Sequence, residues 1–515
     1  MFAKLNAALD RFWRIPLVYF AILTILALAT PLTFAPHYHF WLMPLLFGGF
    51  IRLTELKPQR KILSAYWFGL VGYTAQFWWI HTALHDVSGL PNLYAVPLTF
   101  LLPAFLALFP ATVFWAYEKY RLPRLIALGV VLPVLWTLAE FARERVFTGF
   151  GWGALGYSQI ADNSFLAGLA PVGGIHLLTL ATALSAAWLV LLVNNTQWRE
   201  RLVAAILLVA LWTTSAHLRG MVFTEKTGKP VSVALVQGNI AQSLKFNEAH
   251  LIETYQRYYE LVSHSKAQIV ILPETAFPQF WQDIELGLVA QFADVAKRNG
   301  SALAIGVPTY TADGAAYLNA MVNLADFDPE KPEKVQIYSK NHLVPFGEYK
   351  PLPEITEPLY RMMNMPLADF KRGGLGQQPF DMSKQKVAFN ICYEDGFGDE
   401  LIPSAKQATL LANSSNMAWY GDSNAMWQQL QQSQARALEL GRYMVRATNT
   451  GVTAVVSPQG HIVAQLPPNQ MGVLETQVQG MTGNTPYMQM GGSMYLMCVL
   501  STIALMLLMY RRKAA

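Results

Sequence analysis

The stretch KVAFNICYEDGFG (386–398) joins a β-strand pattern to one of the few thiols in this sequence. Residues 386–391 are mostly apolar and predict a buried strand. Cys392 follows directly, and it is one of only two cysteines among 515 residues. Polar residues and two glycines then end the strand. Loops that follow strands commonly carry function, so this thiol is the first candidate for a reactive group.

Similar strand patterns recur on both sides of this stretch and alternate with helical periodicity. The other predicted strands are 231–238, 267–274, 301–308, 320–326, 334–340, 408–415, 443–449, 453–460 and 472–478. The predicted helices are 248–264, 282–299 and 425–441. More strands than helices, in alternation, predict a layered α/β domain with a mixed sheet.

The composition of the whole chain indicates a membrane protein with one soluble domain. Hydrophobic residues make up 53% and charged residues 14%, whereas about 25% of residues are charged in an average soluble domain. The apolar excess lies in residues 1–220 and again near the C-terminus. A net charge of +5 without a long basic run gives no support to nucleic-acid binding.

Apolar stretches of about 20 residues are long enough to cross a bilayer as helices. Eight membrane spans are predicted: 16–33, 38–51, 63–83, 94–117, 125–142, 164–192, 202–219 and 493–510. This pattern divides the chain into seven spans in residues 1–220, a soluble domain in 221–485, and a final span with a short tail in 486–515.

The distribution of Lys and Arg predicts the orientation of these spans, because cytoplasmic loops are enriched in both. The connections 52–61, 118–124 and 197–201 are basic, as are the two termini, whereas 83–92 has neither residue type. With eight spans, these five basic stretches all fall on one side, and Arg143 and Arg145, at the outer end of the fifth span, are the exception. The prediction is therefore that both termini are cytoplasmic and that residues 221–485 face the periplasm of a bacterium.

Three reactive side chains stand at or just after predicted strand ends: Glu274, Lys340 and Cys392. Together they could catalyse acyl transfer, with Glu274 removing the thiol proton, Cys392 attacking a carbonyl, and Lys340 stabilising the oxyanion. The Tyr393 backbone N–H would assist. Taken singly, each residue also fits an ordinary role: a small buried thiol, a turn carboxylate, or a solvated charge at a sheet edge.

The strings around these residues resemble a known family. LPETAFP (272–278), YSKNHLVPFGEY (338–349) and ICYEDGFG (391–398) resemble, in order, the Glu–Lys–Cys signature of the nitrilase superfamily. Three further strings narrow the resemblance to bacterial apolipoprotein N-acyltransferases: TGFGWGALGYSQ (148–159), VQGNIAQSLKF (236–246) and RALELGRYMVRATNTGVTAVV (436–456). The resemblance covers nearly the whole chain.

This resemblance implies an αββα nitrilase-like domain on a base of eight transmembrane helices in the bacterial inner membrane. It implies an acyltransferase that takes the sn-1 acyl chain of a phospholipid, preferably phosphatidylethanolamine, onto a cysteine as a thioester. The acyl chain then passes to the α-amino group of the diacylglyceryl-cysteine that begins an apolipoprotein, the last step of lipoprotein maturation. No cofactor, metal or nucleic-acid partner is implied.

The resemblance also assigns roles to individual residues. Glu274, Lys340 and Cys392 take the catalytic positions, and Glu348, Tyr393 and Glu394 take supporting ones. Phe246 and Trp419 match residues of a substrate-binding lid.

The chain departs from the family pattern at several positions near this lid. Phe246 replaces a usual Trp, Met417 a usual Asp, and Gln429 a usual His. The catalytic residues are unchanged, so altered substrate preference or rate is expected before loss of activity. Two other interpretations stay open: a membrane-tethered nitrilase-like amidase, in which water releases the acyl group, and a non-catalytic membrane scaffold.

Overall fold

The structure, a computed structural model, describes residues 15–119, 122–194, 197–245, 247–362, 369–492 and 501. The chain forms two compact units. The first is helical and contains residues 15–78 and Val96–Met221. The second is an α/β unit made of Trp79–Ala95 and Val222–Gln489.

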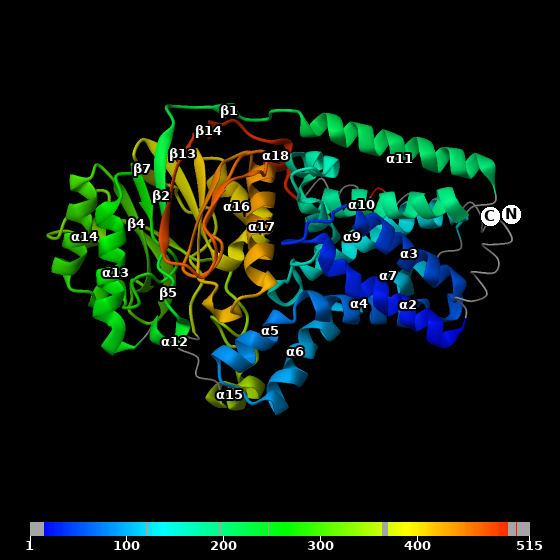
Figure 1. Ribbon diagram of the computed structural model, residues 1–515, viewed down its shortest axis with the longest axis horizontal. Coiled ribbons are helices and arrows are strands. Elements are labelled where there is room, and N and C mark those ends of the chain that lie inside the picture. Colours follow the sequence, from blue (N-terminus) through cyan, green and yellow to red (C-terminus); the bar gives the residue numbers. More distant parts are fainter. Residues whose placement is uncertain are drawn as a thin grey trace. The chain divides into compact units, whose positions relative to one another are not determined.

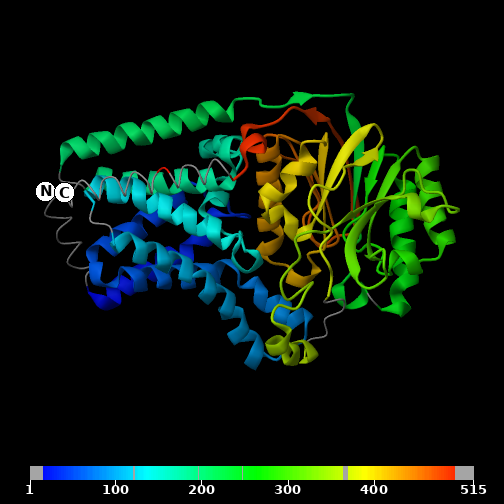
Figure 2. The same cartoon turned by 180° about the vertical axis from the view of Figure 1, so that it is seen from behind.

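The helices of the first unit lie side by side in both views (Figures 1 and 2). They are α2 (Pro16–Ala29), α3 (Leu42–Leu56), α4 (Lys61–Gln76), α7 (Leu108–Glu118), α9 (Leu132–Arg143), α10 (Ala170–Asn194) and α11 (Trp198–Arg219), with most of α6 (Asn92–Leu106). Helix α11 exposes many apolar side chains, including Leu202, Ile206 and Val209. Such a surface is stable in lipid and costly in water.

Five helical stretches in the described residues are long and apolar enough to cross a membrane: Pro16–Thr33, Asn92–Glu118, Arg124–Arg143, Phe165–Asn194 and Trp198–Arg219. They coincide with five of the predicted spans. The predicted spans 38–51 and 63–83 overlap the shorter helices α3 and α4, but α3 runs to Leu56 and α4 begins at Lys61. The predicted span 493–510 lies outside the described residues, apart from residue 501.

The prediction of one continuous helix over 63–83 is wrong at its C-terminal end. Helix α4 stops at Gln76, and Trp79–Ala95 belongs to the α/β unit. The indole of Trp79 packs edge-to-face against Tyr420, with ring centroids 4.7 Å apart, and its Nε1 donates to Gln428 at 3.4 Å. Phe77, Trp78 and Trp79 continue the apolar run beyond Gln76, which is why the sequence predicted a longer helix. The contacts of Trp79 with Tyr420 and Gln428 are too distant in sequence to be predicted from that run.

Two six-stranded sheets form the centre of the α/β unit (Figure 1). One has the order β13 (Gly472–Val478), β2 (Val231–Gln237), β3 (Ile269–Ile271), β4 (Ala302–Tyr310), β5 (Tyr317–Asn323) and β6 (Gln336–Ser339). The other has the order β12 (Ile462–Gln465), β11 (Ala454–Val456), β10 (Met444–Thr448), β9 (Leu410–Ser415), β8 (Gln385–Ile391) and β7 (Phe380–Met382). Both sheets mix parallel and antiparallel pairs.

The central strands are buried on both faces because each sheet is covered on both sides. Val233 and Leu235 of β2 join a core shared with the second sheet. Ala234 and Val236 of the same strand join a core shared with α13 (Leu251–His264) and α14 (Leu286–Arg298). Helices α16 (Gly398–Ala405) and α17 (Asn424–Leu440) lie on the outer side of the second sheet (Figure 1). The order of layers is therefore αββα.

All ten predicted strands and all three predicted helices are present. The mixed-sheet, layered α/β prediction for this unit is confirmed. Four short strands were not predicted: β1 (Glu225–Lys226), β7, β12 and β14 (Met481–Thr482). They are partly exposed edge segments without a long apolar run, so their pairing depends on tertiary contacts.

Phe277 provides a test of the core that supports the first sheet. It is fully buried, and its ring lies 4.9 Å from that of Tyr255 and 4.8 Å from that of Phe292. Phe277→Ala is expected to lower the free energy of unfolding by about 3–5 kcal/mol, since it leaves a cavity. Thermal unfolding in detergent would measure this. Phe280→Ala, at a half-buried ring, should cost clearly less; equal losses would contradict the packing described.

Candidate active site

The turn that carries Cys392 is held by a buried carboxylate. Cys392 follows β8 and has φ of +53°, a left-handed conformation that is uncommon for residues other than glycine. Glu394 accepts hydrogen bonds from the backbone N–H of Ile391 at 2.6 Å, of Asn341 at 2.7 Å and of His342 at 3.1 Å. These bonds stabilise the turn and tie it to the segment that follows Lys340.

The carboxylate of Glu274 lies just after β3, with both oxygens held by donors. Oε1 accepts from Asn319 Nδ2 at 2.7 Å, and Oε2 accepts from the backbone N–H of Asn416 at 2.8 Å. Gly306 in β4 makes room for this loop, because a Cβ there would lie 2.3 Å from the Pro273 carbonyl oxygen. Glu274 is buried and fixed in one orientation.

Lys340 lies after β6, with an ammonium group that is 1% exposed. Its Nζ is 2.8 Å from Oε2 of Glu348 and 3.6 Å from Oε1 of Glu274. Burial acts to lower the pKa of Lys340, but the two carboxylates outweigh it and the net direction is upward. The ammonium therefore remains charged throughout the physiological pH range.

Asn319 of β5 joins the two carboxylates, and sequence reasoning missed it. Its Nδ2 donates to Glu274 Oε1 at 2.7 Å and to Glu348 Oε1 at 2.9 Å, and its backbone carbonyl accepts from the Lys340 backbone N–H. The available signal was a polar residue inside an otherwise apolar strand. That signal alone does not distinguish a polar residue on the protein surface from one that belongs to an active site.

Burial and a neighbouring carboxylate keep the Cys392 thiol protonated at rest. Burial raises the pKa of this thiol to about 12, the Glu274 carboxylate adds to the effect, and Lys340 opposes it. The side chain is half-buried. Because the thiolate is the nucleophilic form, this thiol could attack a carbonyl only if a base took its proton, and Glu274 is the carboxylate with the larger effect on the pKa of the sulfur.

The structure places the remaining predicted site residues as follows. Glu348 contacts Lys340 as described, and Glu394 stabilises the turn through backbone N–H groups. Tyr393 is buried, and its ring lies 5.1 Å from that of Phe397. Trp419 is half-buried in the short helix η12 (Ala418–Tyr420). Phe246 lies outside the described residues.

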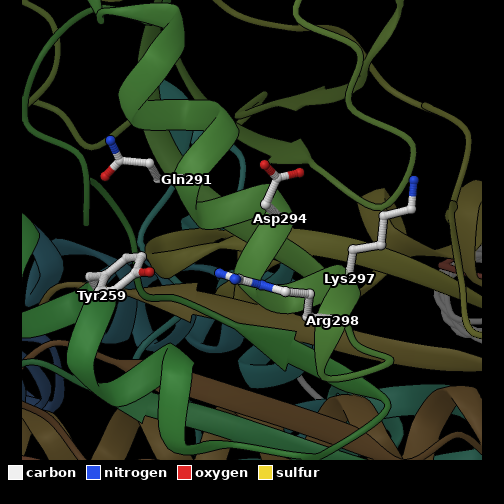
Figure 3. Close-up of a pocket in the computed structure, with 5 residues that line it drawn as sticks. All are labelled: Tyr259, Gln291, Asp294, Lys297 and Arg298. Carbon is white, nitrogen blue, oxygen red and sulfur yellow. The ribbon is translucent and has the colours of Figure 1, made fainter.

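A surface cavity of about 350 Å³ lies between α13 and α14 (Figure 3). It is lined by Tyr259, Gln291, Asp294, Lys297 and Arg298 and contains none of the predicted catalytic residues. Among the residues that the structure describes, no group of three or more His, Cys, Asp or Glu side chains could hold a metal ion.

Two matches to known families define the class of protein. Residues 232–487 match the family described as "Carbon-nitrogen hydrolase", which covers the two sheets and their helices. Residues 26–188 match the "Apolipoprotein N-acyltransferase N-terminal domain". Residues 232–487 thus have the fold of the carbon–nitrogen hydrolase family, and residues 26–188 form a helical domain like that at the N-terminus of apolipoprotein N-acyltransferases.

Full-length relatives then define the family. Over 506 residues the chain is 59% identical to the apolipoprotein N-acyltransferase of Neisseria meningitidis serogroup B, covering 98% of this chain and 99% of that protein. It is 45% identical to the apolipoprotein N-acyltransferase of Chromobacterium violaceum, covering 94% and 92% respectively. The chain belongs to the apolipoprotein N-acyltransferase family.

Asn319→Leu tests the bridge between the carboxylates. Without the amide, the two carboxylates lose a shared donor and the geometry around Lys340 loosens, so we expect kcat to fall roughly 10- to 100-fold, as for other residues that orient catalytic groups. Asn323→Ala is the matched control, because Asn323 lies in the same strand and bonds Gln336 instead. Equal kcat values for the two variants would show that Asn319 has no special role.

The protonated thiol predicts a distinctive pH dependence. With a pKa of about 12 for Cys392, alkylation by a small neutral haloacetamide should rise about tenfold per pH unit between about pH 7 and pH 10, without a plateau. Glu274→Gln removes a charge that raises this pKa, so alkylation at about pH 9 should become faster while acyl transfer is lost. Mass spectrometry of the Cys392 peptide measures the rate. A plateau near neutral pH would indicate a preformed thiolate.

Proposed function

We propose that this chain, an acyltransferase of the family named above, transfers the sn-1 acyl chain of a phospholipid to the α-amino group of a diacylglyceryl-cysteine at the N-terminus of apolipoproteins. Phosphatidylethanolamine is the proposed donor, and the reaction is the last step of lipoprotein maturation. The observation that carries this proposal is the buried cluster of Glu274, Lys340 and Glu348 beside the thiol of Cys392.

In the first half-reaction, Glu274 takes the thiol proton as the sulfur attacks the ester carbonyl. Lys340 and the Tyr393 backbone N–H donate to the oxyanion that forms on the carbonyl oxygen. The bond from the carbonyl carbon to the glycerol oxygen then breaks, and the proton on Glu274 passes to that oxygen. A lysophospholipid leaves, and the acyl chain remains on Cys392 as a thioester.

In the second half-reaction, the α-amino group of the acceptor attacks the thioester carbonyl. Glu274 removes a proton from the amine, and Lys340 again stabilises the oxyanion. The carbon–sulfur bond breaks as the amide forms, and the proton returns to the sulfur. The two substrates thus use one site in turn, which is a ping-pong scheme.

The proposed membrane arrangement has eight spans in the bacterial inner membrane, with both termini in the cytoplasm and the catalytic unit in the periplasm. Seven spans come from residues 1–220, residues 221–485 form the catalytic part, and 486–515 supply the last span and tail. The five long apolar helices support this arrangement, as does the positive charge of the proposed cytoplasmic connections. A thiol that reacts with membrane lipids must lie near a leaflet.

Two aromatic residues are proposed to contact the lipid substrates, Trp419 and Phe246. Support for Trp419 comes from its half-buried position three residues after Asn416, whose backbone N–H holds Glu274. For Phe246, the support is the family pattern alone. Met417, between Asn416 and Trp419, is fully buried, so this departure adds apolar contact inside the protein and does not extend the lipid-facing surface.

The test uses purified full-length protein in detergent with labelled phosphatidylethanolamine and a diacylated lipopeptide. The expected result is a labelled thioester on Cys392 without acceptor, and an N-acylated peptide when acceptor is added. Cys392→Ala should lower transfer on the order of 10⁴-fold or more, as removal of a nucleophile does in other covalent enzymes.

Release of free fatty acid without N-acylation would show instead that water deacylates the thioester, which is the amidase-like alternative. Cys392→Ala with full transfer would contradict the covalent scheme. Tyr259→Phe, in the surface cavity between α13 and α14, is a control that should leave transfer unchanged.

A further inference from the structure

A glutamine side chain contacts the sulfur of Cys392 from a helix that the mechanism has not used. Gln429 lies on α17 and is 1% exposed. Its Nε2 is 3.6 Å from Cys392 Sγ, within hydrogen-bond range for sulfur, and 3.5 Å from Ser415 Oγ. Helix α17 thus presents a hydrogen-bond donor to the sulfur, whereas a base would accept a proton from it.

The orientation of this amide is dictated by Arg446. A guanidinium group can only donate hydrogen bonds, and Nη2 of Arg446 donates to Oε1 of Gln429. The amide oxygen is therefore committed to Arg446, and the NH₂ group must face the sulfur. A flipped amide would place two donors against each other and its oxygen against a thiolate.

Arg446 is in turn fixed by the turn that carries the nucleophile. It is fully buried on β10, and its Nη1 lies 3.2 Å from Asp395 Oδ2 and 2.6 Å from Asn413 Oδ1. Ser433, one turn after Gln429 on α17, donates to the same Asp395 oxygen. The connection therefore starts at Asp395, three residues after the nucleophile, and returns to its sulfur through Arg446 and Gln429.

A hydrogen-bond donor at this position stabilises negative charge on a sulfur whose surroundings disfavour it. Burial and Glu274 raise the pKa of the Cys392 thiol, while Lys340 and the hydrogen bond from Gln429 act in the opposite direction. Lys340 is also bound by two carboxylates. Gln429 is neutral, so it can stabilise negative charge on sulfur without adding a group that titrates.

We propose that Gln429 is a catalytic residue whose Nε2–H donates to Cys392 Sγ when negative charge is on the sulfur, during attack on the donor ester and again when the sulfur leaves the thioester. Arg446 and Asp395 are positioning residues for this amide. The inference rests on the acyl-transfer function proposed above, but the contact itself requires only the thiol.

Two substitutions of Gln429 test this role. Gln429→Glu keeps an acceptor for Arg446, and so keeps the buried network paired, but removes the donor to sulfur. Gln429→Met removes both groups at similar volume. Gln432→Met is the matched control, because Gln432 lies on the same helix and is 2% exposed, and no hydrogen bond joins its amide to the sulfur.

Two readouts are measured for each variant in the full-length protein. The first is the rate of alkylation of Cys392 by a neutral haloacetamide at about pH 9, which needs no lipid. Loss of the donor should lower it about tenfold, the effect of one pKa unit, and more in Gln429→Glu because its charge faces the sulfur. The second is transfer, where kcat should fall about tenfold or more with KM for the donor phospholipid unchanged. Gln429→His, which can still donate, should recover part of both.

The inference is overturned if Gln429→Glu and Gln429→Met match Gln432→Met in both readouts. It is also overturned if KM rises while kcat and alkylation are unchanged, since that would indicate substrate binding. If the wild-type protein alkylates as expected but transfers no acyl chain, the proposed function fails while the contact between Gln429 and the sulfur stands.

Discussion

The buried contact between Lys340 and two carboxylates is the constraint on which the catalytic unit depends. An ammonium group that is 1% exposed is stable only when paired, and Glu348 provides the close partner at 2.8 Å. Glu274, at 3.6 Å, adds a second carboxylate. Neutral donors must then satisfy the carboxylate oxygens, and Asn319 and the backbone of Asn416 do so. The ends of strands from both sheets therefore have to meet at one place.

Burial, together with the Glu274 carboxylate, explains the state of the thiol. A thiolate is disfavoured where water is excluded and a carboxylate lies nearby, so Cys392 keeps its proton at rest. The two acids beside it, Glu394 and Asp395, contribute to geometry. Glu394 accepts backbone N–H groups of the turn, and Asp395 pairs with Arg446. The two acids that follow Cys392 in the sequence therefore contact different parts of the structure.

The strands, and the reactive residues at their ends, could be predicted from the sequence because both depend on local patterns. Glu274, Lys340 and Cys392 each follow an apolar run, and the family resemblance added Glu348. Asn319 could not be found this way, since its role depends on which strands are neighbours. Gln429 lies in a glutamine-rich stretch that suggests a polar helix face, yet α17 is buried on nearly every side. Polar residues in such a helix are explained only by their partners on other elements.

A thiol that stays protonated also has a consequence for survival in an oxidising environment. Peroxides and disulfides react with thiolates far more readily than with thiols, so oxidation to sulfenic acid follows thiolate character and exposure. In the compartment proposed for the catalytic unit, a nucleophile with a lowered pKa would be exposed to continual oxidative loss. The half-buried, protonated Cys392 is a poor target for oxidants, because the burial and the nearby carboxylate that keep the proton on the sulfur also protect it from oxidation.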